Sequence, residues 1–302
     1  MSLRGTFPAM LTPYNTDLSI NREEYLRLAR FGLECGLDGI FCNTSVGDSL
    51  ALSFKKKVEL MELSLEAAGG APVIGGIGSC VYEESLELAK EGKRLGLSAL
   101  LLQPPSYYPL DEDGLVAYFE YMASRVSLPL YVYNIPLFTP ILSHRVVERL
   151  GGVANIVGMK DSGGSAVDFA HFAAVCKLDL FVGREEFYLG GLLAGAKGSM
   201  TASGCVFPEV MAGIYKAFND GDLNQAKKLQ ASILEAIRFA SKLPFPIGFV
   251  LLLEARSFNF NNTTSPHPLH GRILENLDSK RAEAKAVIES LDKSIGLKNH
   301  RR

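Results

Sequence analysis

The sequence lacks a charge excess of either sign and any long hydrophobic run. Its 302 residues carry a formal net charge of −2, so the electrostatics do not favour nucleic acid or a membrane surface as a partner. The longest apolar stretches, such as residues 97–102 and 247–253, are far too short to span a bilayer. No basic start followed by an apolar run opens the chain, so we expect no signal peptide and a cytoplasmic location.

Cysteines are few and dispersed, and the common cofactor motifs are missing. The five cysteines form no CxxC pair, so we expect reduced thiols that mostly act as small core residues. No cluster of Asp, His and Cys has the spacing of a metal site, which predicts neither a metal nor a cofactor. A GxSxG elbow, a P-loop and a GxGxxG after the first strand are also absent, which argues against the enzyme classes that use them.

Short apolar segments alternate with amphipathic segments along most of the chain. Strands are expected at residues 6–11, 39–43, 72–78, 98–102, 130–134, 156–160, 180–183 and 198–201. Helices are expected at 21–35, 53–68, 82–95 and 112–126, from near 143, 165 and 186, and after 208, with Asn21 and Ser53 as N-caps. Eight strands, each followed by a helix, predict a parallel (β/α)8 TIM barrel of the α/β class. A doubly wound open sheet is the alternative. It is less favoured because the candidate catalytic residues follow many strands, whereas such a sheet binds its ligand at one topological switch point.

The pattern becomes purely helical beyond residue 220. Helices are expected at about 223–241, 246–255 and 278–291, with a frayed end at 298–302. We therefore predict two units, a catalytic barrel at 1–220 and C-terminal helices at 221–302 that pack on the barrel.

One strand ends in a lysine. Strand side chains alternate, so Gly158, Lys160 and Ser162 share a face of the segment that begins at Ile156. If this face is buried, the ammonium group must either pair with a carboxylate or give up its proton and become an amine. A neutral amine can condense with a carbonyl compound to form a Schiff base. The alternative is a lysine that extends to water at the strand end.

Catalysis in such a barrel occurs at the C-terminal ends of the strands. The chain places one lysine there, together with phenols, hydroxyls and glycines: Ser45, Gly47, Asp48, Gly78, Tyr107, Tyr108, Tyr133, Lys160, Gly183, Glu185 and Thr201 to Ser203. Tyr133 ends the strand next to the lysine strand, where a phenol could move protons. The turn at Ser45 could hold a carboxylate. Each residue also has a structural interpretation, as a core aromatic or a turn residue.

Several short motifs together resemble one known family. They are Ser45-Val46-Gly47-Asp48 against a GTTGE-like turn, Tyr133-Asn134-Ile135-Pro136 against YNxP, and Gly158-Met159-Lys160-Asp161-Ser162 against GxKxx. The loop 105–109 and Gly183-Arg184-Glu185-Glu186 also fit. From about residue 5 to 256 the sequence thus resembles the dihydrodipicolinate synthase/N-acetylneuraminate lyase family of pyruvate-type class I aldolases.

The resemblance implies roles for particular residues. Lys160 would form the Schiff base with pyruvate or another 2-oxo acid, and Tyr133 would shuttle protons. Tyr107, or Tyr108 if the loop is shifted, would reach a neighbouring subunit's site, which implies a dimer or tetramer. The expected substrate-binding residues are Ser45, Val46, Ser162, Gly183, Glu185, Glu186 and Ser203.

The chain departs from the family pattern at four positions. Thr44 replaces a glycine, Val46 replaces a second threonine, and Asp48 replaces a glutamate. Phe138 stands where the synthase branch carries an arginine for the second carboxylate of its substrate. Glu185 and Glu186 resemble the acidic pair that meets sugar hydroxyls in sialic acid lyases, although acidic residues are also common at helix starts. Arg184 could instead pair with an acidic substrate tail.

Together these features predict a cofactor-free class I aldolase or lyase that joins pyruvate to an aldehyde or cleaves the product. The expected substrate is a hydroxylated 2-oxo acid, of the 2-keto-3-deoxy sugar acid or N-acetylneuraminate type. Dihydrodipicolinate synthase and 2-keto-3-deoxy acid dehydratase are the alternatives with the same Schiff base. A barrel that binds a keto acid without turnover is the alternative of another class.

Overall fold

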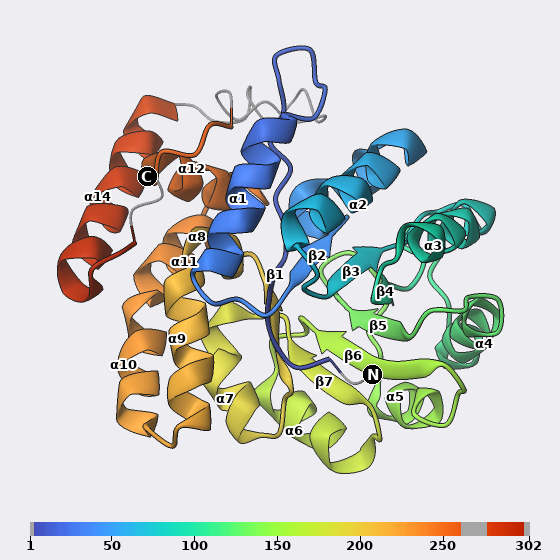
Figure 1. The fold of residues 1–302 in the computed structure, drawn as a ribbon. Coiled ribbons are helices and arrows are strands. Elements are labelled where there is room, and N and C mark those ends of the chain that lie inside the picture. The colour runs from blue at the N-terminus through green and yellow to red at the C-terminus, as the bar shows by residue number, and fades with distance from the viewer. Residues whose placement is uncertain (1–2, 261–276, 299–302) are drawn as a thin grey trace.

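Eight parallel strands form a barrel at the centre of the molecule (Figure 1). The computed structural model describes residues 3–260 and 277–298. Neighbouring strands pair in the order β1-β8-β7-β6-β5-β4-β3-β2, and a single bridge between Ala9 and Phe41 closes the ring between β1 and β2. The strands are β1 Gly5–Pro8, β2 Ile40–Cys42, β3 Val73–Gly76, β4 Ala99–Leu102, β5 Leu130–Asn134, β6 Ile156–Asp161, β7 Asp179–Val182 and β8 Gly198–Thr201. The prediction of a (β/α)8 barrel is confirmed, and an open sheet is ruled out.

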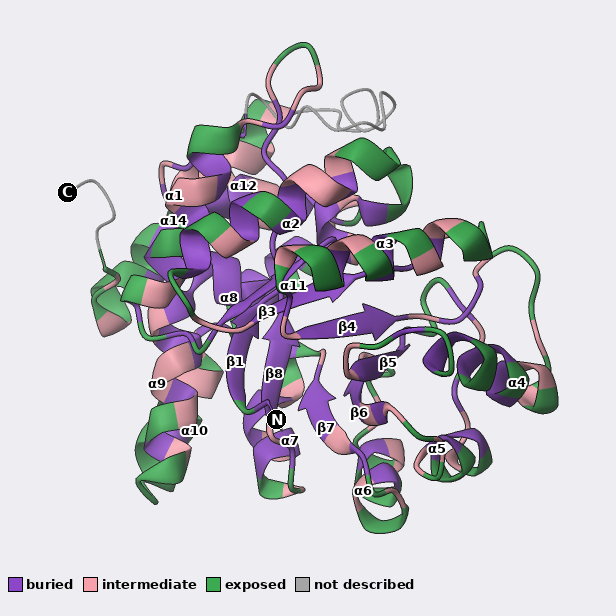
Figure 2. Ribbon diagram, turned by 45° about the vertical axis from the view of Figure 1, so that its right-hand side comes forward, coloured by how far each residue is buried: buried purple, intermediate pink, exposed green. Residues whose placement is uncertain are grey.

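A helix follows each strand and covers the outside of the barrel. The helices are α1 Arg22–Glu34, α2 Phe54–Ala68, α3 Tyr82–Leu95, α4 Glu112–Ala123, α5 His144–Leu150, α6 Ala166–Val175 and α7 Tyr188–Leu193, then α8 Ser203–Val206 and α9 Pro208–Asn219. Asn21 and Ser53 cap α1 and α2 as expected, since their side chains accept hydrogen bonds from the Glu24 and Lys56 N–H groups. Figure 2 shows the buried strands at the centre, surrounded by helices whose outer faces are exposed.

The chain beyond α9 is helical, with one difference from the prediction. The helices are α10 Leu223–Ser232, α11 Leu234–Ser241, α12 Ile247–Ala255 and α14 Leu277–Ile295. The single helix expected at 223–241 is broken at the buried Ile233, which separates α10 from α11. Residues 299–302 of the expected frayed end lie outside the described residues. Within residues 3–260 and 277–298 there is no helix with the length and apolar character needed to cross a membrane.

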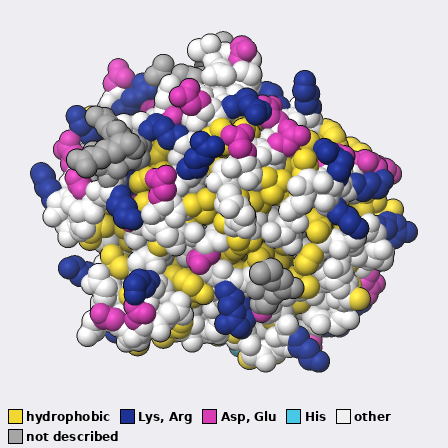
Figure 3. All heavy atoms as spheres, viewed as in Figure 1, with side chains coloured by type: hydrophobic (Ala, Val, Ile, Leu, Met, Phe, Trp, Pro, Cys, Tyr) yellow, Lys and Arg dark blue, Asp and Glu magenta, His cyan; other side chains and the backbone are white. Residues whose placement is uncertain are grey.

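Aromatic rings fill the barrel below the lysine strand's tip. Phe181 packs edge-on against Phe7 and Tyr131, with ring centroids 6.0 and 5.7 Å apart. Gly158 leaves room for one of these rings, because a Cβ there would lie 2.2 Å from Tyr131 Cε1. Lys160 lies near the tip of β6 and is paired in register with Phe181 of β7. On the face seen in Figure 3, basic and acidic side chains are intermixed, in keeping with the low net charge.

Candidate active site

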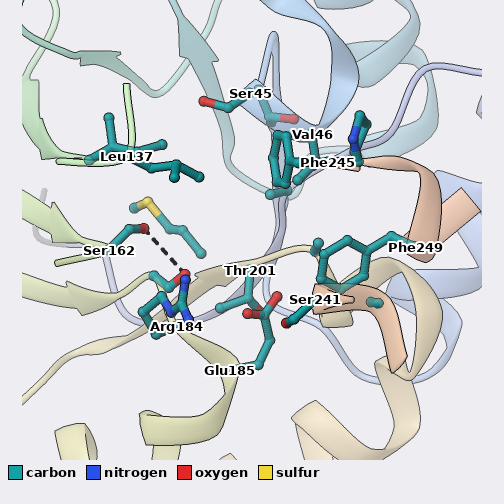
Figure 4. Close-up of a pocket in the computed structure, with 18 of the residues that line it drawn as sticks. Ser45, Val46, Leu137, Ser162, Arg184, Glu185, Thr201, Ser241, Phe245 and Phe249 are labelled. Atoms are coloured by element: carbon teal, nitrogen blue, oxygen red, sulfur yellow. Dashed lines mark hydrogen bonds between the residues drawn. The ribbon is translucent and has the colours of Figure 1, made fainter. Parts of the chain in front are cut away.

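A cavity of about 330 Å³ opens at the C-terminal ends of the strands. Figure 4 shows side chains from several strand tips and from the C-terminal helices pointing into it. Eight of the predicted site residues line this cavity: Ser45, Val46, Tyr133, Lys160, Ser162, Gly183, Glu185 and Glu186. The barrel thus brings together, at one end, side chains that are more than 140 positions apart in the chain.

Lys160 is buried at the tip of β6. Its side chain leaves the residue 4% exposed, so it does not extend to water. The Nζ atom lies 4.2 Å from the ring centroid of Tyr133 and 5.0 Å from that of Phe41. Among the described residues, no carboxylate lies within 4.0 Å of this nitrogen. The amine is therefore surrounded by aromatic faces in a cavity that a small molecule can enter.

Tyr133 is adjacent to the lysine because β5 and β6 pair in parallel. Tyr133 and Lys160 occupy the same register position of the ladder. The Tyr133 hydroxyl lies 3.4 Å from Ser162 Oγ, which donates to the Gly183 carbonyl oxygen at 3.2 Å. Gly183 is needed at this point, since a Cβ there would lie 2.1 Å from Ser162 Oγ. These contacts link the hydroxyl of Tyr133, on the strand paired with that of Lys160, to the hydroxyl of Ser162.

The turn after β2 is held by the threonine that replaces a family glycine. Thr44 Oγ1 donates to the Met10 carbonyl at 2.7 Å and accepts from the Gly47 N–H at 3.0 Å. Its hydroxyl is therefore used to fix the short 3-10 turn Ser45–Gly47. Ser45 and Val46, the first residues of this turn, line the cavity. Thr44 thus stabilises the turn, while Ser45 keeps a hydroxyl that faces the ligand space (Figure 4).

The acidic pair after β7 divides into a buried and a half-exposed carboxylate. Glu185 is 7% exposed, and its Oε1 accepts a hydrogen bond from the Ser203 N–H at 3.2 Å. Burial raises the pKa of the Glu185 carboxyl, and the nearby charge of Glu186 raises it further. Glu186 forms an ion pair with Arg184 at 3.4 Å on the rim. Glu185 is thus the member of the pair that belongs to the cavity's interior.

Comparison with known proteins decides the family. The model of the dihydrodipicolinate synthetase family matches residues 2–286. The chain belongs to this family. The resemblance inferred from the motifs is confirmed, and so is the prediction of an enzyme of the pyruvate-dependent class I aldolase type.

Relatives in the family carry several names. The 4-hydroxy-tetrahydrodipicolinate synthase of Trichlorobacter lovleyi is 29% identical over 259 residues, or 84% of this chain and 89% of that protein. The prophage protein YagE of E. coli, solved with pyruvate, has a TM-score of 0.87 at 23% identity and covers 97% of this chain and 99% of its own. CdNal of Clostridium difficile, solved with mannosamine, has a TM-score of 0.86 at 21% identity, covering 96% and 100%. The two structures share the fold with this family member.

Tyr107, its alternative Tyr108 and Ser203 do not line the cavity. Tyr107 and Tyr108 are 79% and 76% exposed and pack on each other, with ring centroids 5.0 Å apart. A role for Tyr107 would need a neighbouring subunit and stays a prediction. Ser203 is fully buried as the first residue of α8, and its backbone N–H, not its hydroxyl, serves the site by holding Glu185. Ser203 is buried because α8, which it begins, follows directly after the end of β8.

Thr201 was predicted to lie at a strand tip but not to bind substrate, and one wall of the cavity was not predicted at all. Thr201 is 1% exposed at the end of β8, lines the cavity, and has no hydrogen-bond partner for its Oγ1 in the part of the chain that the structure describes. The wall consists of Ile237, Ala240, Ser241, Leu243, Phe245, Pro246 and Phe249, from α11, α12 and their connection. The site thus crosses the predicted unit boundary at residue 220. The position of Thr201 at a strand tip was a usable signal, whereas nothing local marked residues 237–249.

Asn134 and Asp161 clamp the tips of β5 and β6, which makes Asn134 of the YNxP motif a positioning residue. The Asn134 amide donates to Asp161 Oδ1 at 2.6 Å and accepts from the Leu142 N–H at 3.0 Å. Burial raises the pKa of the Asp161 carboxyl, and hydrogen bonds from Asn134 and the Gly163 N–H oppose this rise. The clamp fixes the strands that carry Tyr133 and Lys160.

Metal ligands do not gather in this structure. In residues 3–260 and 277–298, no three His, Cys, Asp or Glu side chains are placed to hold a metal ion.

Proposed function

We propose that Lys160 forms a Schiff base with the carbonyl carbon of pyruvate or another 2-oxo acid, and that the enzyme cleaves or forms a carbon–carbon bond to an aldehyde. The observation that carries this proposal is the buried Nζ, which lies beside Tyr133 in the cavity without a carboxylate partner among the described residues. An amine that is not held in an ion pair is free to attack a carbonyl carbon.

In the proposed mechanism, Tyr133 donates and accepts the protons. The Lys160 amine adds to the carbonyl, and Tyr133 donates a proton to the departing hydroxyl, so that water leaves and an iminium forms. For cleavage, Tyr133 accepts the proton of the hydroxyl on carbon 4 while the bond between carbons 3 and 4 breaks. The electron pair moves into the iminium to give an enamine, and the aldehyde leaves. Protonation of carbon 3 and hydrolysis then release pyruvate.

The polar residues of the cavity support a hydroxylated 2-oxo acid as substrate. Ser45 and the turn that begins there are proposed to hold the carboxylate. Ser162, with its hydroxyl 3.4 Å from that of Tyr133, is proposed to contact the hydroxyl that loses its proton. Glu185 and Thr201 offer further hydrogen bonds to a hydroxylated chain. The 2-keto-3-deoxy sugar acids and N-acetylneuraminate are two types of substrate in this class.

Synthase activity is the second candidate, because relatives such as that of Trichlorobacter lovleyi are named 4-hydroxy-tetrahydrodipicolinate synthase. It would condense pyruvate with aspartate semialdehyde, whose carboxylate is the second one in the site and needs a cation. Phe138 lines the cavity where that branch carries an arginine, and Arg184 is paired with Glu186. We therefore expect poor turnover with aspartate semialdehyde. A 2-keto-3-deoxy acid dehydratase, which keeps the Schiff base, is separated by assaying for loss of water in place of aldehyde release.

Borohydride trapping tests the central step. The protein is incubated with pyruvate and sodium borohydride, and the reduced adduct is located by peptide mapping and mass spectrometry. Lys57 serves as an internal control, because it is as buried as Lys160, at 3% exposure, but is ion-paired with Glu84 at 2.9 Å. We expect an adduct on Lys160 and none on Lys57. A folded protein without an adduct on Lys160 would disprove the mechanism. An adduct without turnover of any aldehyde or 2-oxo acid would favour a binding protein.

We also propose that the enzyme is a homodimer or homotetramer in which Tyr107 contacts a second subunit. Tyr107 and Tyr108 are large aromatic side chains exposed to solvent in the single chain. Light scattering of the purified protein gives the mass in solution. A Tyr107→Ala variant is expected to weaken the assembly, whereas a monomeric wild type would remove this role.

A further inference from the structure

The cavity has two walls of different chemistry. One wall, from the tips of β6 to β8, carries Lys160, Ser162, Glu185 and Thr201. The other wall, which we call the apolar wall, comes from the loop after β5 and from α11, α12 and their connection. It consists of Leu137, Phe138, Ile237, Ala240, Leu243, Phe245, Pro246 and Phe249. Figure 4 shows Phe245 and Phe249 on the side of the cavity away from Ser162 and Arg184.

The outer part of the apolar wall leaves aromatic surface open to water. Phe138 and Phe245 are 42% and 37% exposed, although their rings pack together with centroids 5.6 Å apart. The two residues come from opposite parts of the chain, the barrel and the C-terminal helices. Large apolar side chains left exposed at the mouth of a binding cavity are surfaces that a ligand covers. An apolar group placed there would remove water from both rings.

The apolar wall offers few hydrogen bonds to a hydroxylated chain. Ser241 is the hydroxyl-bearing residue among those at 237–249 that line the cavity, and its proton is donated to the Ile237 carbonyl within α11 at 2.9 Å. A hydroxyl group moved from water to the 237–249 part of this wall would find the Ser241 Oγ as its one side-chain acceptor and would lose most of its hydrogen bonds. The wall therefore disfavours a polyol tail.

The charged side chains at the cavity mouth do not favour a charged substrate tail either. Arg184 lines the cavity, but its guanidinium is ion-paired with Glu186 at 3.4 Å. Glu185 presents a carboxyl on the same side, so a second substrate carboxylate would meet acidic groups as well as the paired arginine. The charges at the mouth thus compensate each other.

We propose that the preferred substrate is a 4-hydroxy-2-oxo acid whose group beyond carbon 4 is apolar or aromatic, and that Phe138, Phe245 and Phe249 bind this group. In the direction of synthesis, the acceptor is a hydrophobic aldehyde, such as an aromatic one. Carbon 3 of pyruvate, as the enamine, bonds to the aldehyde carbon, and the aldehyde oxygen takes a proton to become the hydroxyl on carbon 4. This inference rests on the proposed Schiff-base function. It keeps the hydroxyl on carbon 4, and it replaces the polyol tail of the sugar-acid types named above by an apolar group.

The test compares two acceptors with pyruvate as donor. Values of kcat/KM for benzaldehyde and glyceraldehyde are measured by following the 4-hydroxy-2-oxo acid product. We expect benzaldehyde to be preferred by about tenfold or more, the discrimination that small differences in apolar contact achieve. A preference for glyceraldehyde, or equal values, would overturn the inference. Borohydride trapping with pyruvate alone distinguishes failure of the two proposals. If no adduct forms on Lys160, the proposed Schiff-base function is wrong. If an adduct forms, the two acceptors test only the chemistry of the group beyond carbon 4.

Variants assign the preference to the apolar wall. In Phe245→Ser the ratio of kcat/KM for benzaldehyde to that for glyceraldehyde should fall about tenfold. Phe245→Leu, which keeps an apolar side chain, should retain most of the ratio and serves if the serine variant does not fold. Phe54→Ser is the matched control, since Phe54 is similarly exposed, at 38%, but lies outside the cavity at the start of α2. A ratio that stays at the wild-type value in both Phe245 variants would show that the wall does not select the acceptor.

Discussion

Two lysines of this barrel are equally buried but have opposite surroundings. Lys57 on α2 is 3% exposed and donates to Glu84 at 2.9 Å, so its charge is balanced within the fold. Lys160 is 4% exposed and faces the rings of Tyr133 and Phe41. Burial alone therefore does not identify a reactive lysine. The absence of a carboxylate beside Lys160, among the residues described, distinguishes the proposed nucleophile from the ion-paired Lys57.

Replacing Tyr133 by phenylalanine should separate Schiff-base formation from turnover. Tyr133→Phe keeps the ring beside Lys160 but removes the hydroxyl that lies 3.4 Å from Ser162 Oγ. We expect borohydride trapping of pyruvate to persist to a large extent, while kcat for cleavage falls by about 100-fold or more. Turnover and adduct yield are measured on the same preparation. Wild-type turnover in the variant would remove Tyr133 from the proton transfers.

Glu185 should make the folded state less stable as the pH rises. Burial raises the pKa of its carboxyl in the folded protein above the ordinary value of 4.5. The folded state thus binds this proton more tightly than the unfolded chain does. The resulting stabilisation is complete below the ordinary pKa and is lost as the pH rises through the raised pKa.

Glu185→Gln removes this titration and can keep the hydrogen bond from the Ser203 N–H. Between pH 4.5 and the raised pKa, the urea midpoint should decline less in Glu185→Gln than in the wild type. Part of the decline remains, because burial also raises the pKa of Asp161. Parallel declines in both proteins would mean that Glu185 does not titrate in this way.

At the scale of elements, the tips of β5 and β6 act as a unit. The Asn134 side chain on β5 donates to Asp161 Oδ1 on β6 at 2.6 Å. Its amide oxygen accepts from the Leu142 N–H at 3.0 Å. The Ser162 N–H donates to the Asn134 carbonyl at 2.8 Å. Side chain and backbone of Asn134 together therefore hold the strand ends at which Tyr133, Lys160 and Ser162 meet.

Asn134→Ala should destabilise the protein by about 2–4 kcal/mol, because it leaves the buried Leu142 N–H without its acceptor and leaves the buried Asp161 carboxyl with the Gly163 N–H but without the Asn134 amide as donor. The free energy of unfolding is measured by urea denaturation, and kcat should fall together with it. Asn134→Asp is the comparison, since it keeps the size but places two carboxyl groups side by side. A wild-type midpoint in Asn134→Ala would mean that other contacts hold the tips.

The whole molecule depends on a buried ion pair between the C-terminal segment and the barrel. Arg256, after α12, is 6% exposed and binds both oxygens of Glu209 on α9, at 2.8 and 3.1 Å. Its guanidinium also donates to the carbonyls of Val206 and Lys298. Since α11 and α12 form the apolar wall, this pair helps to attach one wall of the cavity to the other.

Arg256→Met should therefore cost about 3–5 kcal/mol of stability, because it leaves the Glu209 carboxylate without its counter-charge, with the Lys298 N–H as a remaining neutral donor. Adding Glu209→Leu should restore part of the loss, since the unpaired charge is then removed. Unfolding midpoints of the wild type, the single variant and the double variant are compared. If the double variant were the least stable of the three, the loss would arise from the carbonyl contacts and not from the buried charge.

The sequence by itself determined the strands and helices, the lysine at a strand tip and the family. These follow from local rules, because alternating burial and helix capping are set by residues a few positions apart. The motifs around Ser45, Tyr133 and Lys160 carried the rest of the prediction, and eight of the ten predicted site residues line one cavity.

Tertiary structure alone decided which partners these residues have. Packing between distant segments decides three features. They are the break at Ile233, the contact of Phe138 with Phe245, and the hydrogen bond from the Thr44 hydroxyl to the Met10 carbonyl. No local pattern marks residues 237–249 as a wall of the site, because a helix face that covers a core and one that lines a cavity have the same apolar periodicity. The sequence therefore predicted a lysine at the strand tip, and packing decided what surrounds its Nζ.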